Sequence, residues 1–336
     1  MAAQIDRQSG GARAGVPRSR RARAGHRGVK RHIGAHVSIA GGVQNAPTRA
    51  AEIGANALGM FTKNQRRWET RDLEAEKVEQ FTTGLLTSGI APENVLVHAS
   101  YLINLGNPDS EKRARSVDAL LDEARRVETL GLTLLNFHPG SGLGEITEAQ
   151  SIDLIASAVV SVLEQTTTAT LVLEATAGQG AHVGYEFEHL AQIIRAAGDS
   201  PRIGVCIDTC HIFSAGHELR TAKSYRETTA RFSDVVGMDR LVGIHLNDSR
   251  SEFGSRHDRH ESIGIGALGL PALARFVTDP RVPDVPVILE TPRPELWAAE
   301  IALLADISEG EIDPETAAPP DPGCSRSCNP ATIAVT

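Results

Sequence analysis

Cysteine is scarce in this sequence, and long apolar runs are missing. The four thiols, Cys206, Cys210, Cys324 and Cys328, are too few for the disulfide scaffold of a small secreted protein, and no secretory signal is visible. No run approaches the roughly 18 apolar residues that a membrane-spanning helix requires. These absences argue against a disulfide-rich protein and a membrane protein, and we expect a reducing, cytoplasmic setting.

Positive charge is also scarce beyond the first residues. Residues 1–31 carry nine Lys or Arg against a single acid, Asp6, which makes this segment +8. Because the whole chain has a net charge of −8, the remainder stands at −16. An acidic body does not by itself favour nucleic-acid binding, although bound divalent cations would offset part of this charge locally.

Two segments lack hydrophobic periodicity, and we expect both to be disordered. The basic extension, residues 1–31, has three interpretations: an arm that contacts phosphates, an organelle-targeting peptide, or an extension without function. Residues 308–336 form a Pro-rich, acidic tail, in which Cys324 and Cys328 are expected to have no role. A single domain, residues 32–307, would lie between the two segments.

Eight short apolar or β-branched runs recur along this domain, with room for a crossover helix after each. The runs are IGAHVS (33–38), ALGMFT (57–62), VLVHAS (95–100), LLNFHPG (134–140), TLVLEAT (170–176), IGVCIDT (203–209), LVGIHLND (241–248) and VPVILET (285–291). Near-continuous apolar runs are typical of strands buried on both faces of a parallel sheet. Apolar residues at helical spacing, with charges opposite, predict helices at 112–130 and 149–164. The alternation predicts an α/β fold, a single (β/α)8 TIM barrel.

Most of these runs end in a residue that can ligate metal. The candidates at the strand ends are His36, His98, His138, Glu174, Asp208 with His211 just beyond, His245 and Glu290. A TIM barrel builds its active site at the carboxyl ends of its strands, so these side chains would converge. One such histidine alone would more often be a satisfied core residue. Many buried imidazoles and carboxylates at one rim are costly without cations, so their joint placement predicts a metal centre.

The segment after the seventh strand adds Asp258 and His260, which would face the same side of an extended chain. Apart from His36, the candidates number nine, too many for one tetrahedral ion and about right for three with a bridging carboxylate. Imidazole and carboxylate favour Zn²⁺, with Mn²⁺ or Fe²⁺ as alternatives. Cys206 and Cys210 are interpreted as packing residues. His36 is left open as a ligand, a supporting residue or a phosphate contact.

Eight longer motifs carry a resemblance to a known family. They are IGAHVSIAGG, FTKNQRRW, SYLINLG, LLNFHPGS, EATAGQG, GVCIDTCHIFSAG, HLNDSRSEFGSRHDRHESIG and VILETP, spread in order over residues 32–307. They closely resemble bacterial endonuclease IV, the apurinic/apyrimidinic endonuclease family. The resemblance implies a TIM barrel with three zinc ions that hydrolyses the phosphodiester 5′ to an abasic site, leaving a 3′-hydroxyl and a 5′-deoxyribose phosphate. It also implies that the enzyme cleans blocked 3′ ends.

The resemblance further assigns the nine candidates to three ions. One zinc would be held by His98, His138 and Glu174. Glu174 would bridge to a second, completed by Asp208, His245 and Glu290. The third would be held by His211, Asp258 and His260. Glu174 and Glu290 are the candidate catalytic residues, because either would orient the attacking hydroxide. Where the family has Asn this chain has Ala175, which puts a supporting hydrogen bond in doubt but not the ligands.

Recognition of DNA is expected from the loops after the second and third strands. The first loop carries the positive and polar residues 63–68, and the second carries Tyr101 and Leu102. An abasic nucleotide has no base to unstack, so a small pocket in a kinked, wedged duplex can select it. By the resemblance, Arg66, Tyr101 and Leu102 would insert into the base stack, whereas Trp68 is expected to pack on the barrel. The partner would be double-stranded DNA with abasic sites or blocked 3′ ends.

Two other functions stay open at this point. A metal-dependent sugar isomerase or epimerase on a related barrel would use fewer ligands and loops that close over a monosaccharide. The segment with Asp258 and His260 and the basic loop argue against it. A non-catalytic barrel that binds damaged DNA would have lost ligands, and all nine are present. We expect a monomer in the cytoplasm that associates with the nucleoid during repair.

Overall fold

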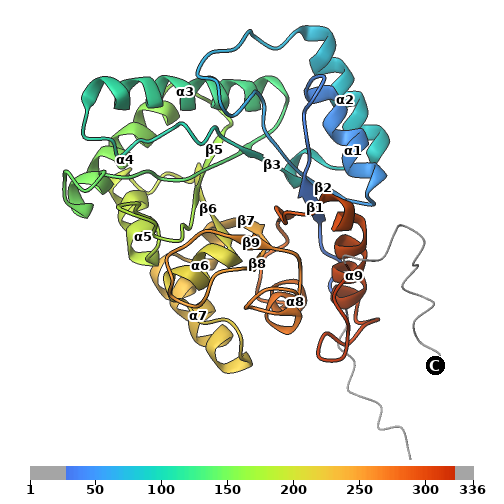
Figure 1. The fold of residues 1–336 in the computed structure, drawn as a ribbon. Helices are drawn as coiled ribbons and strands as arrows, with labels where there is room; N and C mark the ends of the chain where they lie inside the picture. Colours follow the sequence, from blue (N-terminus) through green and yellow to red (C-terminus); the bar gives the residue numbers. More distant parts are fainter. Residues whose placement is uncertain (1–27, 322–336) are drawn as a thin grey trace, which may run out of the picture.

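The computed structural model describes residues 28–321, in which eight parallel strands close into a barrel (Figure 1). In the order of their pairing the strands are β1 (Ile33–His36), β10 (Val287–Leu289), β7 (Leu241–His245), β6 (Ile203–Asp208), β5 (Thr170–Glu174), β4 (Leu134–Phe137), β3 (Val95–His98) and β2 (Ala57–Met60). Every neighbouring pair is parallel, as right-handed strand–helix units require. The predicted TIM barrel is confirmed.

Helices surround the barrel (Figure 1). They are α1 (Ala46–Glu52), α2 (Ala75–Ser88), α3 (Ser110–Thr129), α4 (Glu148–Leu163), α5 (Phe187–Ala196), α6 (Thr209–Ala215), α7 (Ala222–Val235), α8 (Leu270–Thr278) and α9 (Trp297–Glu309), with the 3-10 turns η1 (Val43–Asn45), η2 (Pro92–Asn94), η3 (Met238–Arg240) and η4 (Pro294–Leu296). Side-chain caps fix the starts of four of these helices, α3, α4, α6 and α7. The Asp109 carboxylate accepts backbone N–H groups at the start of α3, and Thr147 forms a capping box with Gln150 before α4. Both helices therefore begin slightly earlier than their apolar spacing predicted.

The strands are shorter than the apolar runs that predicted them. The run at 241–248 contains two elements, β7 and then β8 (Asp248–Ser249), which pairs antiparallel with β9 (His260–Glu261). The prediction of one strand there was wrong for a local reason. The Thr209 hydroxyl bonds both the N–H and the carbonyl of Asn247, so this residue leaves the barrel ladder. The β8–β9 hairpin then extends from the rim.

A small apolar layer fills the inside of the barrel below the rim. It consists of Ala57, Leu96, Val172, Cys206 and Ile288, one from each of five strands. A Cβ atom at Gly243 of β7 would lie 2.9 Å from Leu96, so glycine leaves room for this layer. Because side chains alternate along a strand, the residues two positions later face the same interior, one layer higher. Those positions include several of the predicted ligands.

The expected boundaries of the domain need correction at both ends. Arg31, which we placed in the basic extension, is buried, and its guanidinium donates to the carbonyls of Val277, Asp279, Val282 and Pro283. A cation enclosed by its own acceptors is not available to DNA. Residues 1–27 of the extension lie outside the described residues. Ile312 and Ala317 of the expected tail pack against the core, and residues 322–336 are again outside the described part.

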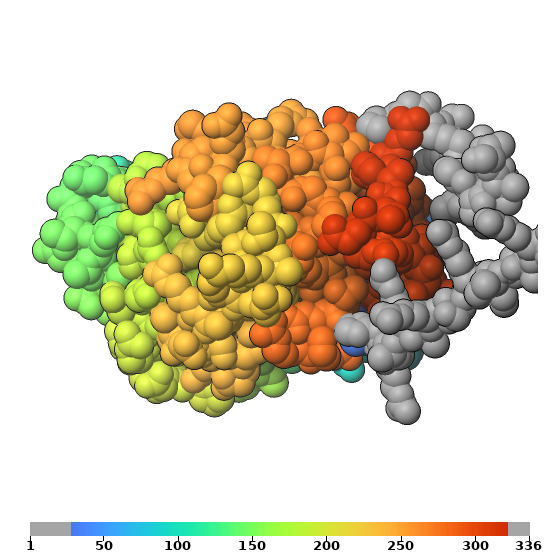
Figure 2. Space-filling model, turned by 90° about the horizontal axis from the view of Figure 1, so that it is seen from below, coloured from blue at the N-terminus to red at the C-terminus, as the bar shows by residue number. Residues whose placement is uncertain are grey.

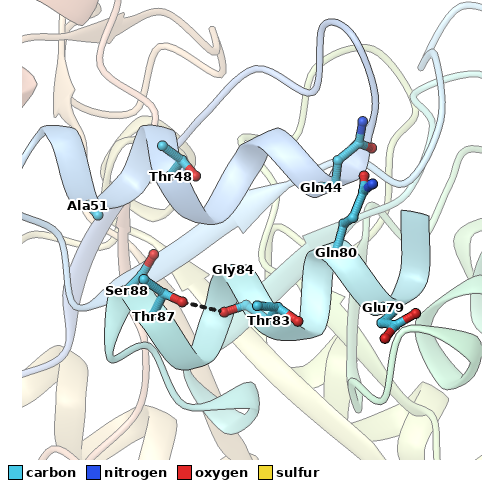
Figure 3. A pocket seen from close by; sticks show the side chains of 9 residues that line it. All are labelled: Gln44, Thr48, Ala51, Glu79, Gln80, Thr83, Gly84, Thr87 and Ser88. Carbon is cyan, nitrogen blue, oxygen red and sulfur yellow. Dashed lines mark hydrogen bonds between the residues drawn. The ribbon is translucent and has the colours of Figure 1, made fainter. Parts of the chain in front are cut away.

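The candidate metal-binding groups among the described residues do not include any on the outer surface of the barrel. Figure 2 shows a face formed mainly by the second half of the chain. Among residues 28–321, no helix is both long and apolar enough to cross a membrane. A groove of about 500 Å³ lies along the surface of α1 and α2 on the outside of the barrel (Figure 3). Its lining is mainly Thr, Gln and Ser, with Glu79 as its one carboxylate, so it does not offer a set of metal ligands. The side chains that could bind metal lie elsewhere, at the rim formed by the carboxyl ends of the strands.

Candidate metal centre

The structure brings all nine predicted ligands together at the carboxyl end of the barrel. Their nitrogen and oxygen atoms form three groups, each within 4.8 Å: His98, His138 and Glu174; Glu174, Asp208, His245 and Glu290; and His211, Asp258 and His260. Glu174 belongs to two groups and can bridge them. The side chains at 98, 174, 208 and 245 lie two positions above the apolar interior layer or its glycine, which explains why they share this space.

Glu174 is the centre of the cluster, and its carboxylate is fully buried. Its Oε2 atom lies 3.2 Å from His98 Nε2 and 3.4 Å from His138 Nε2. Its Oε1 atom lies 3.2 Å from Nδ1 of both His211 and His245. Its two oxygens thus face different imidazoles, His98 and His138 on one side and His245 on the other, so this carboxylate could serve two adjoining metal sites.

Three histidines are fixed in orientation by backbone carbonyls. The Nδ1 atoms donate to these oxygens in the pairs His98–Ala99 at 2.7 Å, His211–Ala175 at 3.0 Å and His260–Glu290 at 3.2 Å. A carbonyl can only accept, so Nδ1 carries the proton and the Nε2 lone pair faces the cluster. This is the tautomer that metal-binding histidines adopt. Residue 175 supports the centre through its carbonyl, which Ala supplies as well as Asn.

Opposite charges within the cluster shift the pKa values of its carboxyls and imidazoles. Burial would raise the pKa of the Glu174 carboxyl, but the neighbouring His245 and His138 hold this pKa well below its ordinary value. Burial likewise opposes the charging of His245, yet Glu290 and Glu174 raise its pKa to about 9. Burial would raise the pKa of Asp258, but the hydrogen bond and the charge of His211 lower it to about 2. Glu174 and Asp258 therefore stay ionised, and a buried carboxylate of this kind needs positive charge beside it.

The residues fit divalent cations. His260 Nε2 is buried, has no hydrogen-bond partner among the described residues, and lies 3.4 Å from Asp208 Oδ2 and 3.3 Å from Asp258 Oδ1. An unpartnered nitrogen between two carboxylates is a ligand position. Five imidazoles and four carboxylates form a donor set that suits Zn²⁺, Mn²⁺ or Fe²⁺.

Cys210 joins a further group with Asp208 and His260 within the same 4.8 Å limit. Burial raises the pKa of this thiol to about 11, with the Asp208 charge adding to the effect. Metals bind the thiolate, so a protonated, buried Cys210 is a weaker donor than the surrounding histidines. Its role as a packing residue, and that of Cys206 in the interior layer, stays a prediction.

His36 occupies a supporting position. Its Nδ1 atom lies 2.8 Å from Glu290 Oε1, and its ring packs 4.4 Å from that of Phe61. None of the ligand groups among the described residues includes it. The contact with Glu290 orients a candidate ligand, which favours the supporting role over the other two interpretations.

Two buried asparagines complete the support, and the sequence analysis missed both. Asn247 donates from Nδ2 to Asp208 Oδ2 at 2.7 Å and accepts the Glu290 N–H at 2.8 Å. Asn136 of β4 donates from Nδ2 to Glu174 Oε2. Each asparagine lies within an apolar run, two positions from a ligand, and therefore faces the same side. An amide inside an otherwise apolar buried strand was the available signal.

Two buried carboxylates hold the β8–β9 hairpin, which carries Asp258 and His260. Asp248 accepts the backbone N–H groups of Ser249, Gly266, Leu268 and Gly269. Glu300 of α9 accepts the Ile263 N–H at 2.9 Å and the Thr291 hydroxyl at 2.7 Å. Backbone donors stabilise both charges, and the hairpin is fixed against the barrel.

The predicted DNA-contacting residues lie beside the cluster and differ in exposure. Arg66 is exposed, Leu102 is half-buried, and Tyr101 is 57% exposed with its ring 5.0 Å from that of His98. A cavity of about 370 Å³ opens between Tyr101, His98 and His138. These residues therefore border the metal centre.

Two other residues of the loop after β2 face inward. Trp68 packs on the core with the Arg115 guanidinium 4.4 Å above its ring, as expected. Lys63, which we counted among the positive residues facing DNA, is buried with its Nζ atom 2.7 Å from Asp122 Oδ2. Its assignment was wrong because α3 supplies carboxylates that attract it away from solvent.

Known proteins resemble this chain in both sequence and structure. The family described as xylose isomerase-like TIM barrel matches residues 47–307. A protein described as probable endonuclease 4 from Campylobacter concisus (strain 13826) is 48% identical over 282 residues, which cover 84% of this chain and all of that protein. Another, from Chlorobium phaeobacteroides (strain BS1), is 50% identical over 281 residues, covering 84% of this chain and 99% of the relative.

Solved structures extend these similarities. The crystal structure of endonuclease IV from Thermus thermophilus has a TM-score of 0.73 and 32% identity, covering 84% of this chain and all of that chain. A D-tagatose 3-epimerase-like protein has a TM-score of 0.63 at 17% identity, covering 83% of this chain and 98% of its own. The second likeness is one of fold alone.

Proposed function

The chain belongs to the endonuclease IV family of xylose isomerase-like TIM barrels, and from this premise we propose that it is a metal-dependent DNA-repair hydrolase that cuts the backbone at abasic sites. The scission lies 5′ to the abasic site and leaves a 3′-hydroxyl and a 5′-deoxyribose phosphate. The same centre removes blocking groups from 3′ ends. The protein acts as a monomer in the cytoplasm, at the nucleoid.

One observation carries the proposal: nine imidazoles and carboxylates from seven different strand ends and loops form three adjoining groups that share Glu174. His98, His138 and Glu174 would hold one Zn²⁺; Glu174, Asp208, His245 and Glu290 a second; and His211, Asp258 and His260 a third. Mn²⁺ or Fe²⁺ could substitute. Divalent ions held there supply Lewis-acid chemistry, since they lower the pKa of water and offset charge that develops on phosphate oxygens.

The chain's own groups do the positioning. Glu290 is held ionised, because the charge of His245 and the hydrogen bond from His36 outweigh its burial and keep its pKa well below the ordinary value. An ionised carboxylate can accept a hydrogen bond from the attacking water and orient it. Glu174 has both oxygens close to imidazoles and would serve mainly as the ligand shared by two ions. Arg66, Tyr101 and Leu102 would insert into the base stack and present the abasic nucleotide.

A sugar epimerase is the other chemistry that this barrel can support. The structures of sugar epimerases share the fold at 11–17% identity, which transfers no activity. The group on the β8–β9 hairpin, His211, Asp258 and His260, gives the cluster a third site beyond the one or two metals of such enzymes. The same cluster, complete in all nine members, disfavours a non-catalytic barrel.

The test pairs a strand-cleavage assay with a metal count on the purified full-length protein. We expect about three divalent ions per chain, incision 5′ to a single abasic residue in a duplex, loss of incision on chelation and recovery with Zn²⁺. An undamaged duplex of the same sequence is the control substrate. Metal-loaded protein that leaves the abasic duplex intact, or holds a single ion, would refute the proposal.

A further inference from the structure

Glu123 is a buried carboxylate outside the metal centre. It lies on α3 with 1% of its surface exposed, and burial raises the pKa of its carboxyl. A carboxylate in this position is costly unless nearby groups bind it. The groups that do so come from two loops, the one after β2 and the one after β3.

The β2 loop contacts Glu123 through two side chains. The Thr62 hydroxyl donates to Glu123 Oε2 at 2.5 Å, and Lys63 Nζ lies 3.7 Å from Oε1 while it pairs more closely with Asp122. Lys63 Nζ also donates to the carbonyl of Trp68 at 3.3 Å. The start of the loop that carries Arg66 is therefore bound to α3 directly, and the Trp68 end is linked to α3 through Lys63 and Asp122.

The β3 loop contacts the same carboxylate and then the neighbouring loop. The Ser100 N–H points to Glu123 Oε1 at 3.4 Å, and the Ser100 hydroxyl donates to the carbonyl of Gln65 at 2.7 Å. The same hydroxyl accepts the Leu102 N–H at 3.2 Å. Gln65 precedes Arg66, so Ser100 connects the two segments that carry the proposed DNA-contacting side chains.

From this geometry we infer that Glu123, with Ser100, is a positioning residue that sets the β2 and β3 loops in the arrangement that receives DNA. The inference rests on the proposed function. Glu123 reaches neither the metal ligands nor the substrate; it acts through Thr62 and Ser100. Preorganised loops lower the free energy that DNA binding must spend on ordering them, so loss of the link raises KM rather than lowering kcat.

Glu128 provides a matched control on the same helix. Its carboxylate also accepts backbone N–H groups, those of Thr167, Thr168 and Ala169, just before β5 begins. It therefore braces the opposite end of the barrel, away from the rim. A glutamine at 128 removes the same charge from the same helix without touching the DNA loops.

The experiment measures steady-state cleavage of an abasic duplex by wild type, Glu123→Gln, Ser100→Ala and Glu128→Gln, with metal content determined for each. We expect KM to rise about tenfold in Glu123→Gln, which weakens hydrogen bonds to a charged group, and about fivefold in Ser100→Ala, which loses the neutral hydrogen bonds of its hydroxyl to Gln65 and Leu102, while kcat changes less than about twofold in both. Metal content stays at the wild-type value. Glu128→Gln keeps the wild-type KM.

Ser100→Ala provides a second test should Glu123→Gln fail to fold. It removes a single hydroxyl and places no additional polar group in the interior. Wild-type KM in both rim variants would overturn the inference, and so would a loss confined to kcat or accompanied by loss of metal. A wild-type protein that does not cut the abasic duplex would instead refute the proposed function.

Discussion

The rim of the barrel has two parts that are built differently. The metal sector comprises the ends of the strands from β3 to β7 and of β10, with the β8–β9 hairpin, and the loop sector comprises the loop segments that follow β2 and β3. In the metal sector the reactive side chains stand on strands or within a few residues of a strand, and buried amides such as Asn247 orient them. In the loop sector the exposed side chains stand on irregular backbone, and a helix braces that backbone from below through Glu123. A strand holds its side chains in place through its own ladder of hydrogen bonds, whereas a loop needs contacts from another element to hold its side chains in place.

This difference predicts different kinetic effects. A change in the metal sector alters groups that act on the reacting phosphate, so it should lower kcat. A change in the loop sector alters how the duplex is received, so it should raise KM. The three predictions that follow test this separation.

The largest effect is expected from Glu290→Gln in the metal sector. The amide keeps the shape of the side chain but loses the charge that His245 and His36 face. We expect kcat to fall by at least about 10³-fold, while affinity for the abasic duplex, measured by fluorescence anisotropy, survives. Glu295→Gln, an exposed carboxylate in the same loop, is the control. An active Glu290→Gln protein would remove Glu290 from the catalytic residues.

Asn247→Ala should have an intermediate effect. It leaves every ligand in place but removes the amide between Asp208 and the Glu290 backbone. Loss of such a partner typically costs about 10–100-fold in metal affinity or activity. Competition with a chelator measures the affinity directly. Asn94→Ala, which removes a buried asparagine at the start of β3, should leave it unchanged. Unaltered metal affinity in Asn247→Ala would mean that the strands alone hold the centre.

The two sectors also differ in how far the sequence reveals them. The metal sector was predictable because His, Asp and Glu are conspicuous at the ends of apolar runs, and barrel topology brings strand ends together. Its asparagines were not predicted, since an amide in a strand has no such signature until its neighbours are known.

The loop sector was predicted less well. Lys63 was counted among the positive residues of a loop expected to receive DNA, and Glu123 was not predicted to have any role. Yet Glu123 is three residues after Leu120 and four before Val127, so it lies on the buried stripe. A charge at an apolar position of a helix was a signal of a buried partner. What the sequence could not supply was the identity of that partner, because Thr62, Lys63 and Ser100 meet Glu123 only in the folded barrel.

The smallest effect is expected from Arg66→Ala in the loop sector. Arg66 is exposed, so its removal disturbs no packing and leaves metal content and kcat unchanged. A guanidinium that lies against the duplex displaces counterions, and the slope of log K against log salt should shrink by about 0.9 for each phosphate that the variant no longer neutralises. Arg281→Ala, an arginine paired with Asp279 between α8 and β10 at the opposite end of the barrel, should leave the slope as it is. If both arginines changed the slope equally, the attraction would come from overall charge, and the loop sector would have no claim to be the surface that receives DNA.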